Sequence, residues 1–273
     1  MPYAQNALDG TSVYFEDDGG SGVPVVLYGG ILDSVESVRA SELVGALQKL
    51  TGEFRLVYAD HRGLGRSDRH HEAEAYAMPL QAADFVAVLT TLGVGRAHLV
   101  GRSYGGRLAL GVGEHAAEHV RSLVVGGQQP YAVNADGPLV SALARAADAT
   151  RREGAVRFVE ALETHWGARI PELERSVYLS QDGASVAAAF EAMLASGDLS
   201  TRLHEWRMPC LIYLGASDGD FLAQARRAAA VIPYADFVGL DELDHLAAHY
   251  EADRIVPAVL RTLRDVSRKS ETR

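Results

Sequence analysis

Short strand-like apolar runs alternate with segments of helical periodicity along most of this chain. The strand-like runs occupy residues 24–28, 54–58, 97–100, 120–125, 210–214 and 236–240. In most of them apolar and polar side chains do not alternate, which is typical of strands buried on both faces in parallel sheets. The alternation therefore predicts the α/β class, with a mostly parallel central sheet and helices on both faces.

The alternation stops between about residues 130 and 207. No strand-like run occurs there, and three alanine-rich segments with helical spacing, 139–152, 156–165 and 186–194, are separated by glycine and proline. We therefore expect a helical insertion at 130–207.

Composition narrows the range of partners and settings. Acidic residues outnumber basic ones 36 to 26, which gives a net charge of −10. This charge disfavours binding to nucleic acid, because proteins bind phosphates through a basic surface. The single cysteine, Cys210, cannot form an internal disulfide, and no apolar run is long enough to span a bilayer. We expect a cytoplasmic protein, a monomer or homodimer, that binds neither nucleic acid nor membrane.

The sequence Gly101-Arg102-Ser103-Tyr104-Gly105 lies where a predicted strand passes into a predicted helix. In this context a Gly-x-Ser-x-Gly pentad holds its serine on a sharp turn, and the glycines avoid clashes between strand and helix. The pentad predicts that Ser103 is a nucleophile. The alternative is a structural serine at the start of a helix.

A serine hydroxyl is a weak nucleophile until a base accepts its proton, and a carboxylate then orients that base. His245 follows the last predicted strand in a short acidic loop, and His249, one helical turn further, is its alternative. Asp218 follows the strand at 210–214, and Asp220 is the nearest rival for the same role. We therefore expect Ser103, His245 and Asp218 to act together.

Attack on a carbonyl places negative charge on its oxygen, and backbone N–H groups must be directed at that position. The Tyr104 amide, just after the nucleophile, and the Gly30 amide, in the turn after residues 24–28, are the predicted donors. Gly29-Gly30 could instead form an ordinary turn. The sequence has no cluster of metal-ligating residues with zinc-protease spacing, so we expect neither a metal nor another cofactor.

Together these segments resemble the α/β-hydrolase superfamily over nearly the whole chain. Leu27-Tyr28-Gly29-Gly30 is similar to its oxyanion segment, residues 60–68 to its Asp-x-Arg-Gly-x-Gly-x-Ser-Asp loop, and residues 101–105 to its nucleophile elbow. Residues 209–218 resemble its acid-bearing strand, and Asp244-His245-Leu246 resembles its histidine loop. Histidine is usual in the family where Tyr28 stands, and glycine is usual where Asp244 stands.

The chain is most similar to small bacterial esterases and lactonases with a helical cap. That resemblance implies an α/β-hydrolase core from residues 1–129 and 208–273, with residues 130–207 as the cap. It also implies a serine hydrolase that cleaves a small carboxylic ester or lactone through an acyl-enzyme. Carbon–carbon or thioester hydrolysis by the same triad, and a non-catalytic ligand-binding or biosynthetic role, are the alternatives.

Three further residues are candidates for substrate contact, namely Tyr28, Arg102 and Trp166. Arg102 places a cation beside the nucleophile, where it could bind an acidic substrate group or pair with a neighbouring carboxylate. Trp166 lies in the predicted insertion, where an aromatic side chain can face a ligand or pack between helices.

Overall fold

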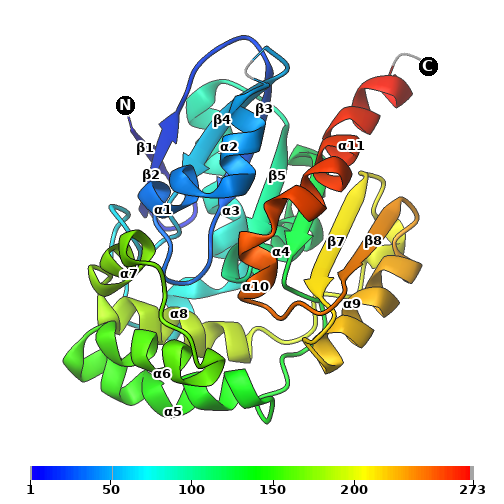
Figure 1. The fold of residues 1–273 in the computed structure, drawn as a ribbon. Helices are drawn as coiled ribbons and strands as arrows, with labels where there is room; N and C mark the ends of the chain where they lie inside the picture. The colour runs from blue at the N-terminus through cyan, green and yellow to red at the C-terminus, as the bar shows by residue number, and fades with distance from the viewer. Residues whose placement is uncertain (1, 51, 271–273) are drawn as a thin grey trace.

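The computed structural model describes residues 2–50 and 52–270, and for residues 266–270 it describes the backbone alone. Within this part of the chain an eight-stranded sheet has the strand order β1-β2-β4-β3-β5-β6-β7-β8 (Figure 1). β1 and β2 are antiparallel to their neighbours, and the strands from β4 to β8 are parallel. The strands are β1 (Tyr3–Gln5), β2 (Ser12–Asp17), β3 (Val23–Tyr28), β4 (Phe54–Ala59), β5 (Ala97–Arg102), β6 (Val120–Gly126), β7 (Cys210–Gly215) and β8 (Ala235–Leu240). The predicted α/β class with a mostly parallel sheet is confirmed.

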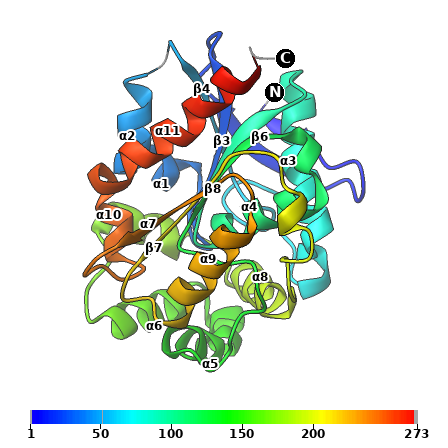
Figure 2. The same cartoon turned by 90° about the vertical axis from the view of Figure 1, so that its right-hand side faces the viewer.

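Helices cover both faces of the sheet. One face carries α3, α4 and α9, and the other carries α1, α2, α10 and α11 (Figure 2). Among the described residues, no helix is both long and apolar enough to cross a membrane. These helices are α1 (Val35–Ala40), α2 (Glu42–Gln48), α3 (Met78–Leu92), α4 (Tyr104–His115), α9 (Asp220–Val231), α10 (Ala247–Tyr250) and α11 (Ala252–Ser270), with 3₁₀ turns η1 (Ala73–Tyr76) and η2 (Ala117–His119).

Successive side chains of the central strands enter opposite layers of the core. In β3, Val25 and Leu27 pack under α1 and α2, whereas Val26 packs with the α3 and α4 layer. The neighbouring strand β5 divides Leu99 and Val100 in the same way. Both layers are therefore apolar, which explains why the strands are nearly continuous apolar runs in the sequence.

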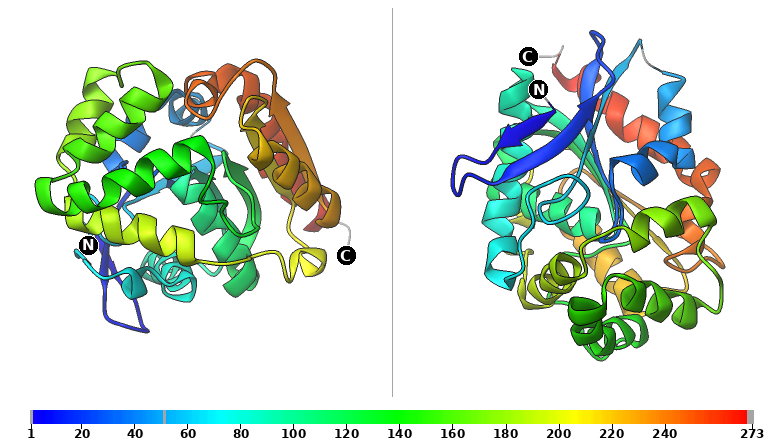
Figure 3. Two further views of the ribbon diagram at one scale, coloured as in Figure 1. Left: turned by 90° about the horizontal axis from the view of Figure 1, so that it is seen from below. Right: turned by 90° about the vertical axis from the view of Figure 1, so that its left-hand side faces the viewer.

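The chain between β6 and β7 forms helices that gather beyond the carboxyl ends of the parallel strands, as Figure 1 and the view from below in Figure 3 show. These helices share an apolar cluster in which the rings of Phe158 and Phe190 pack edge to face, with centroids 5.4 Å apart. Leu32 and Leu64 from loops of the sheet join the cluster. The segments are α5 (Pro138–Glu153), α6 (Val156–Trp166), α7 (Glu172–Leu179), α8 (Gly183–Ala195) and η3 (Leu203–Glu205).

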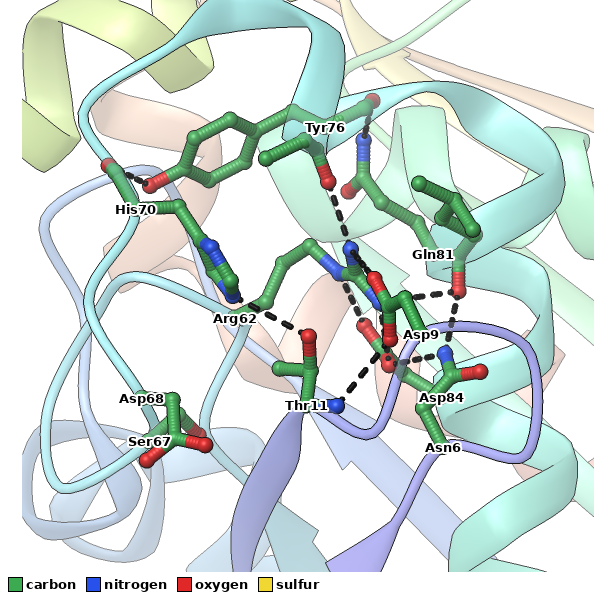
Figure 4. A network of polar contacts seen from close by, with 12 residues as sticks. Asn6, Asp9, Thr11, Arg62, Ser67, Asp68, His70, Tyr76, Gln81 and Asp84 are labelled. Carbon is green, nitrogen blue, oxygen red and sulfur yellow. Dashed lines mark hydrogen bonds and ion pairs between the residues drawn. The ribbon is translucent and has the colours of Figure 1, made fainter.

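A buried ion-pair network anchors the loop at 60–68 (Figure 4). The Arg62 guanidinium, which is 1% exposed, donates to both carboxylate oxygens of Asp84 at 2.6 and 2.8 Å and to Asp9 at 2.9 Å. Asn6 donates to the same Asp84 carboxylate at 2.6 Å. Because these buried charges are paired and hydrogen-bonded, the network ties the loop to α3 and to the N-terminal segment.

Arg107 of α4 joins the helical insertion to the helix that begins next to Ser103. Its fully buried guanidinium donates to the carbonyl oxygens of Gln129 and Tyr131, at 2.9 Å each, near the start of the insertion. It also donates to Ser196 Oγ at 2.8 Å and to the Gly197 carbonyl at 2.5 Å, after α8. One side chain therefore holds both connections of the insertion.

We predict that Arg107→Met destabilises the protein by about 3 kcal/mol, because it leaves several buried acceptors without donors. Chemical denaturation measures this change. Arg157→Met is the control: Arg157 forms only exposed pairs with Glu153 and Glu160, so its loss should change stability by less than about 0.5 kcal/mol. Equal stability of the two variants would contradict the role of Arg107.

Candidate active site

Ser103 connects β5 to α4 with an unusual backbone conformation. Its φ of 55° and ψ of −117° lie in a region that residues with a side chain rarely adopt. Its N–H donates to the Gly126 carbonyl at 2.8 Å, which holds the turn against β6. A Cβ on Gly101 would lie 2.0 Å from the Gly105 carbonyl oxygen, so the strand and helix can approach this closely only with glycine there. The serine is thus held on a strained strand-to-helix turn.

His245 reaches Ser103 from the loop that follows β8. Its Nε2 atom lies 3.0 Å from Ser103 Oγ, a hydrogen-bond distance between residues 142 positions apart. The ring lies beside Gly127, where a Cβ would be 2.7 Å from His245 Cε1. His249, the alternative base, instead lies 3.5 Å from Glu174 Oε1 of α7. The structure therefore places His245, rather than His249, on the Ser103 hydroxyl.

Asp218 lies in the turn after β7, next to the His245 loop. Backbone N–H groups of His245 and Gly215 face its carboxyl group, and its Oδ2 atom is buried with no hydrogen-bond partner among the described residues. Burial and the neighbouring Asp244 carboxylate raise the pKa of Asp218 to about 7. Asp220, the rival residue, is exposed at the first position of α9. Asp218 thus contacts the backbone of the His245 loop, whereas no hydrogen bond joins its carboxyl group to the His245 ring among the described residues.

The surroundings of His245 oppose a positive charge on its ring. Burial lowers its pKa to about 3, and the Arg102 guanidinium and His249 act in the same direction. The imidazole is therefore neutral near pH 7 and can accept a proton from Ser103 Oγ. The imidazolium that results needs an anion nearby.

The two predicted oxyanion donors differ in whether their N–H groups already have an acceptor. Tyr104 is the first residue of α4, a position whose amide has no partner within the helix. The Gly30 N–H already donates to Asp33 Oδ2 at 2.5 Å, and Ser37 Oγ donates to the other carboxylate oxygen at 2.8 Å. Sequence reasoning missed Asp33. Its only signal was an acidic residue three positions after Gly30 in the turn that leads into a helix.

Asp33 is buried, being 5% exposed, yet it is held as a carboxylate. Burial favours the neutral acid, but Arg102 and His249, with the hydrogen bonds from Gly30 and Ser37, outweigh it and lower the pKa of Asp33. An ionised carboxylate of the protein itself thus occupies one predicted oxyanion donor.

The three further candidates lie in different surroundings. Tyr28 is 3% exposed at the end of β3, and its ring lies against His61 with centroids 5.0 Å apart. Trp166 ends α6 and packs against the apolar cluster of the insertion. Arg102 is half-buried directly before Ser103, and among the described residues its buried Nε and Nη1 atoms have no hydrogen-bond partner.

Similar proteins of known name share this architecture. RutD of Caulobacter segnis, named as a candidate carbamate hydrolase, is 31% identical over 215 residues, which cover 70% of this chain and 74% of that protein. The enol-lactonase of Burkholderia xenovorans LB400 has a TM-score of 0.79 and 24% identity, covering 96% of this chain and 99% of its own. The bottromycin epimerase BotH, solved with bottromycin A2, has a TM-score of 0.78 and 22% identity, covering 96% and 98%.

The two structural similarities establish the fold alone, because their sequence identities are low. The sequence profile of the α/β-hydrolase fold family provides the assignment, since it matches residues 23–258, most of the chain. This range includes β3 with its glycine turn, the Ser103 elbow and the His245 loop. The protein belongs to the α/β-hydrolase fold family.

Proposed function

We propose that this protein is a serine hydrolase that cleaves a small carboxylic ester or lactone through an acyl-enzyme. The observation that carries the proposal is the 3.0 Å contact between His245 Nε2 and the hydroxyl of Ser103 on its strained turn. A base within hydrogen-bond distance of a serine is the arrangement that nucleophilic catalysis requires.

In this mechanism Ser103 Oγ attacks the substrate carbonyl while His245 takes the hydroxyl proton and passes it to the leaving group. A water activated by His245 then releases the acyl group. The Asp218 carboxylate stabilises the imidazolium. The amides of Tyr104 and Gly30 hold the oxyanion, so the incoming oxygen must displace Asp33 from the Gly30 amide. No cofactor takes part.

The helical insertion supplies the other wall of the site and acts as its cap. Glu174 of α7 accepts a hydrogen bond from Tyr250 at 2.6 Å, and this contact joins the insertion to α10, which follows the loop that carries His245. The names of RutD and of the Burkholderia enol-lactonase support hydrolysis of an acyl bond, and RutD adds carbamates to the substrates worth testing.

A second role, ligand binding or biosynthetic chemistry without hydrolysis, is favoured by two observations. Asp33 occupies the Gly30 amide, and Asp218 Oδ2 has no partner within the described residues. The similarity to the epimerase BotH shows that the fold also occurs in a protein named for another reaction. A fluorophosphonate probe distinguishes the two roles, because it labels only an activated serine.

We expect hydrolysis of p-nitrophenyl esters, simple lactones or carbamate esters to fall about 1,000-fold or more in Ser103→Ala, His245→Ala and Asp218→Asn. Steady-state kinetics on this panel measures the effect. Activity that survives in Ser103→Ala would contradict the mechanism. No turnover and no probe labelling in the folded parent protein would favour the second role.

The raised pKa of Asp218 predicts the pH dependence. Asp218 acts as a carboxylate, so kcat/KM should fall as the pH drops through about 7, where this group gains a proton. Asp244→Asn removes the nearby charge that raises this pKa, while an asparagine oxygen can still accept from the Ala247 N–H.

We therefore expect Asp244→Asn to move the acid limb of the pH profile to lower pH. Asp220→Asn, at the exposed start of α9, should leave the limb in place. If the limb stays unchanged in Asp244→Asn, it does not report Asp218.

Gly127→Ala tests the position of the His245 ring. The new methyl group would lie 2.7 Å from His245 Cε1, and Gly127 has a φ of +66°. We expect the ring to be displaced and kcat to fall at least about tenfold. Gly45→Ala in α2 is the control, since nothing lies within 4 Å of a Cβ there and kcat should not change. A parent-like kcat in Gly127→Ala would show that the ring does not need this space.

A further inference from the structure

Arg102 is a cation beside the nucleophile that keeps two hydrogen-bond donors unused. Its Nε and Nη1 atoms are buried, and no acceptor within the described part of the chain lies at hydrogen-bond distance from them. Leaving such donors unsatisfied costs about 1–3 kcal/mol each, and more when the group is charged. A guanidinium in this state is suited to receive an acceptor from a ligand.

Two carboxylates that interact with His249, a neighbour of Arg102, are already engaged by other donors. Asp33 accepts hydrogen bonds from the Gly30 N–H and the Ser37 hydroxyl. Glu174 accepts a hydrogen bond from the Tyr250 hydroxyl and lies 3.5 Å from His249 Nε2. Arg102 influences the pKa of Asp33 through its charge, but no ion pair joins these two described side chains within 4 Å. The Nε and Nη1 atoms of the guanidinium therefore have no hydrogen-bond acceptor among the described residues.

Space is available beside the guanidinium. A cavity of about 40 Å³ is lined by Arg102, Asp33, Ser37 and His249 among others. At least about 10–15 Å³ is needed for one water molecule, so the cavity admits a small polar group or a few waters. A carboxylate is of this size, and guanidinium groups bind carboxylates through paired N–H donors.

The charge of Arg102 also bears on the chemistry at His245. Proton transfer from Ser103 creates an imidazolium, and the charge of the Arg102 guanidinium opposes it, as the lowered pKa of His245 reflects. An anion bound to Arg102 would offset this repulsion. The same anion would satisfy the two unused donors.

We propose that the substrate carries a carboxylate a few bonds from its scissile carbonyl, and that Arg102 binds this carboxylate through Nε and Nη1. The inference rests on the proposed hydrolase function and specifies its substrate class. Arg102 is then a specificity-determining residue, and a neutral ester of the same shape is a poorer substrate.

The test compares two esters that differ only in this group. Monoethyl succinate carries the carboxylate, and in ethyl 4-methylpentanoate an isopropyl group replaces it. We expect the parent protein to show a kcat/KM at least tenfold higher for monoethyl succinate. In Arg102→Met the ratio of kcat/KM for monoethyl succinate to kcat/KM for the neutral ester should fall at least tenfold.

Two further variants control for folding and for charge in general. Arg102→Met removes a charge that helps to keep the buried Asp33 ionised, so thermal denaturation checks that the variant still unfolds in one cooperative transition. Arg102→Lys keeps the charge and should retain part of the preference. Arg69→Met removes an exposed cation, 64% exposed in its side chain, and should leave both kcat/KM values unchanged.

A binding measurement separates this inference from the proposed function. Calorimetry of Ser103→Ala with monoethyl succinate needs no turnover, and we expect binding at least tenfold weaker when Arg102→Met is added. Equal kcat/KM for both esters in the parent, or binding that is absent or insensitive to Arg102, overturns the carboxylate proposal. Loss of all ester turnover with binding intact would instead count against hydrolysis alone.

Discussion

The register of the parallel strands is the constraint on which the site depends. Tyr28 pairs with Gly101, Arg102 with Gly126, and Gly126 with Tyr213, so β3, β5, β6 and β7 end at the same level. The turns that leave these strands therefore meet at one edge. A shift of register in one strand would move its turn away from the others and would exchange its buried faces.

The charges at this edge are unevenly compensated. Asp33 is fixed on the Gly30 amide, Asp218 has a carboxylate oxygen without a partner, and Arg102 has two unused donors beside His245. Burying polar or charged groups without hydrogen-bond partners lowers the stability of the folded protein. Their gathering around the Ser103–His245 pair fits a site whose ligand completes the hydrogen bonding.

Most regular elements were predictable because their period is a local property. The strands from β3 to β8 lie within a residue or two of their predicted ends. The helix predicted to follow the pentad begins at Tyr104, directly after the turn that Ser103 makes. Residues 247–266 have the periodicity of one helix, but the structure divides them into α10 and α11.

Three short elements escaped prediction because each is too short to show a clear period in the sequence. β1 is a strand of three residues, defined by its pairing with β2. α1 is six residues long and is set by the Ser34 cap, and α7 is short and rich in charge. Such elements gain their stability from the neighbours on which they pack rather than from their own sequence.

The sequence by itself determined the class of fold and the candidates for nucleophile, base and acid. Periodicity and glycine placement are local properties, so they can be recognised from the sequence alone. Only the tertiary structure decided that His245 rather than His249 meets Ser103, that Asp33 holds the Gly30 amide and that two Arg102 donors have no partner among the described residues. These outcomes depend on distances between residues far apart in the chain and on burial, which sets the strength of their charges.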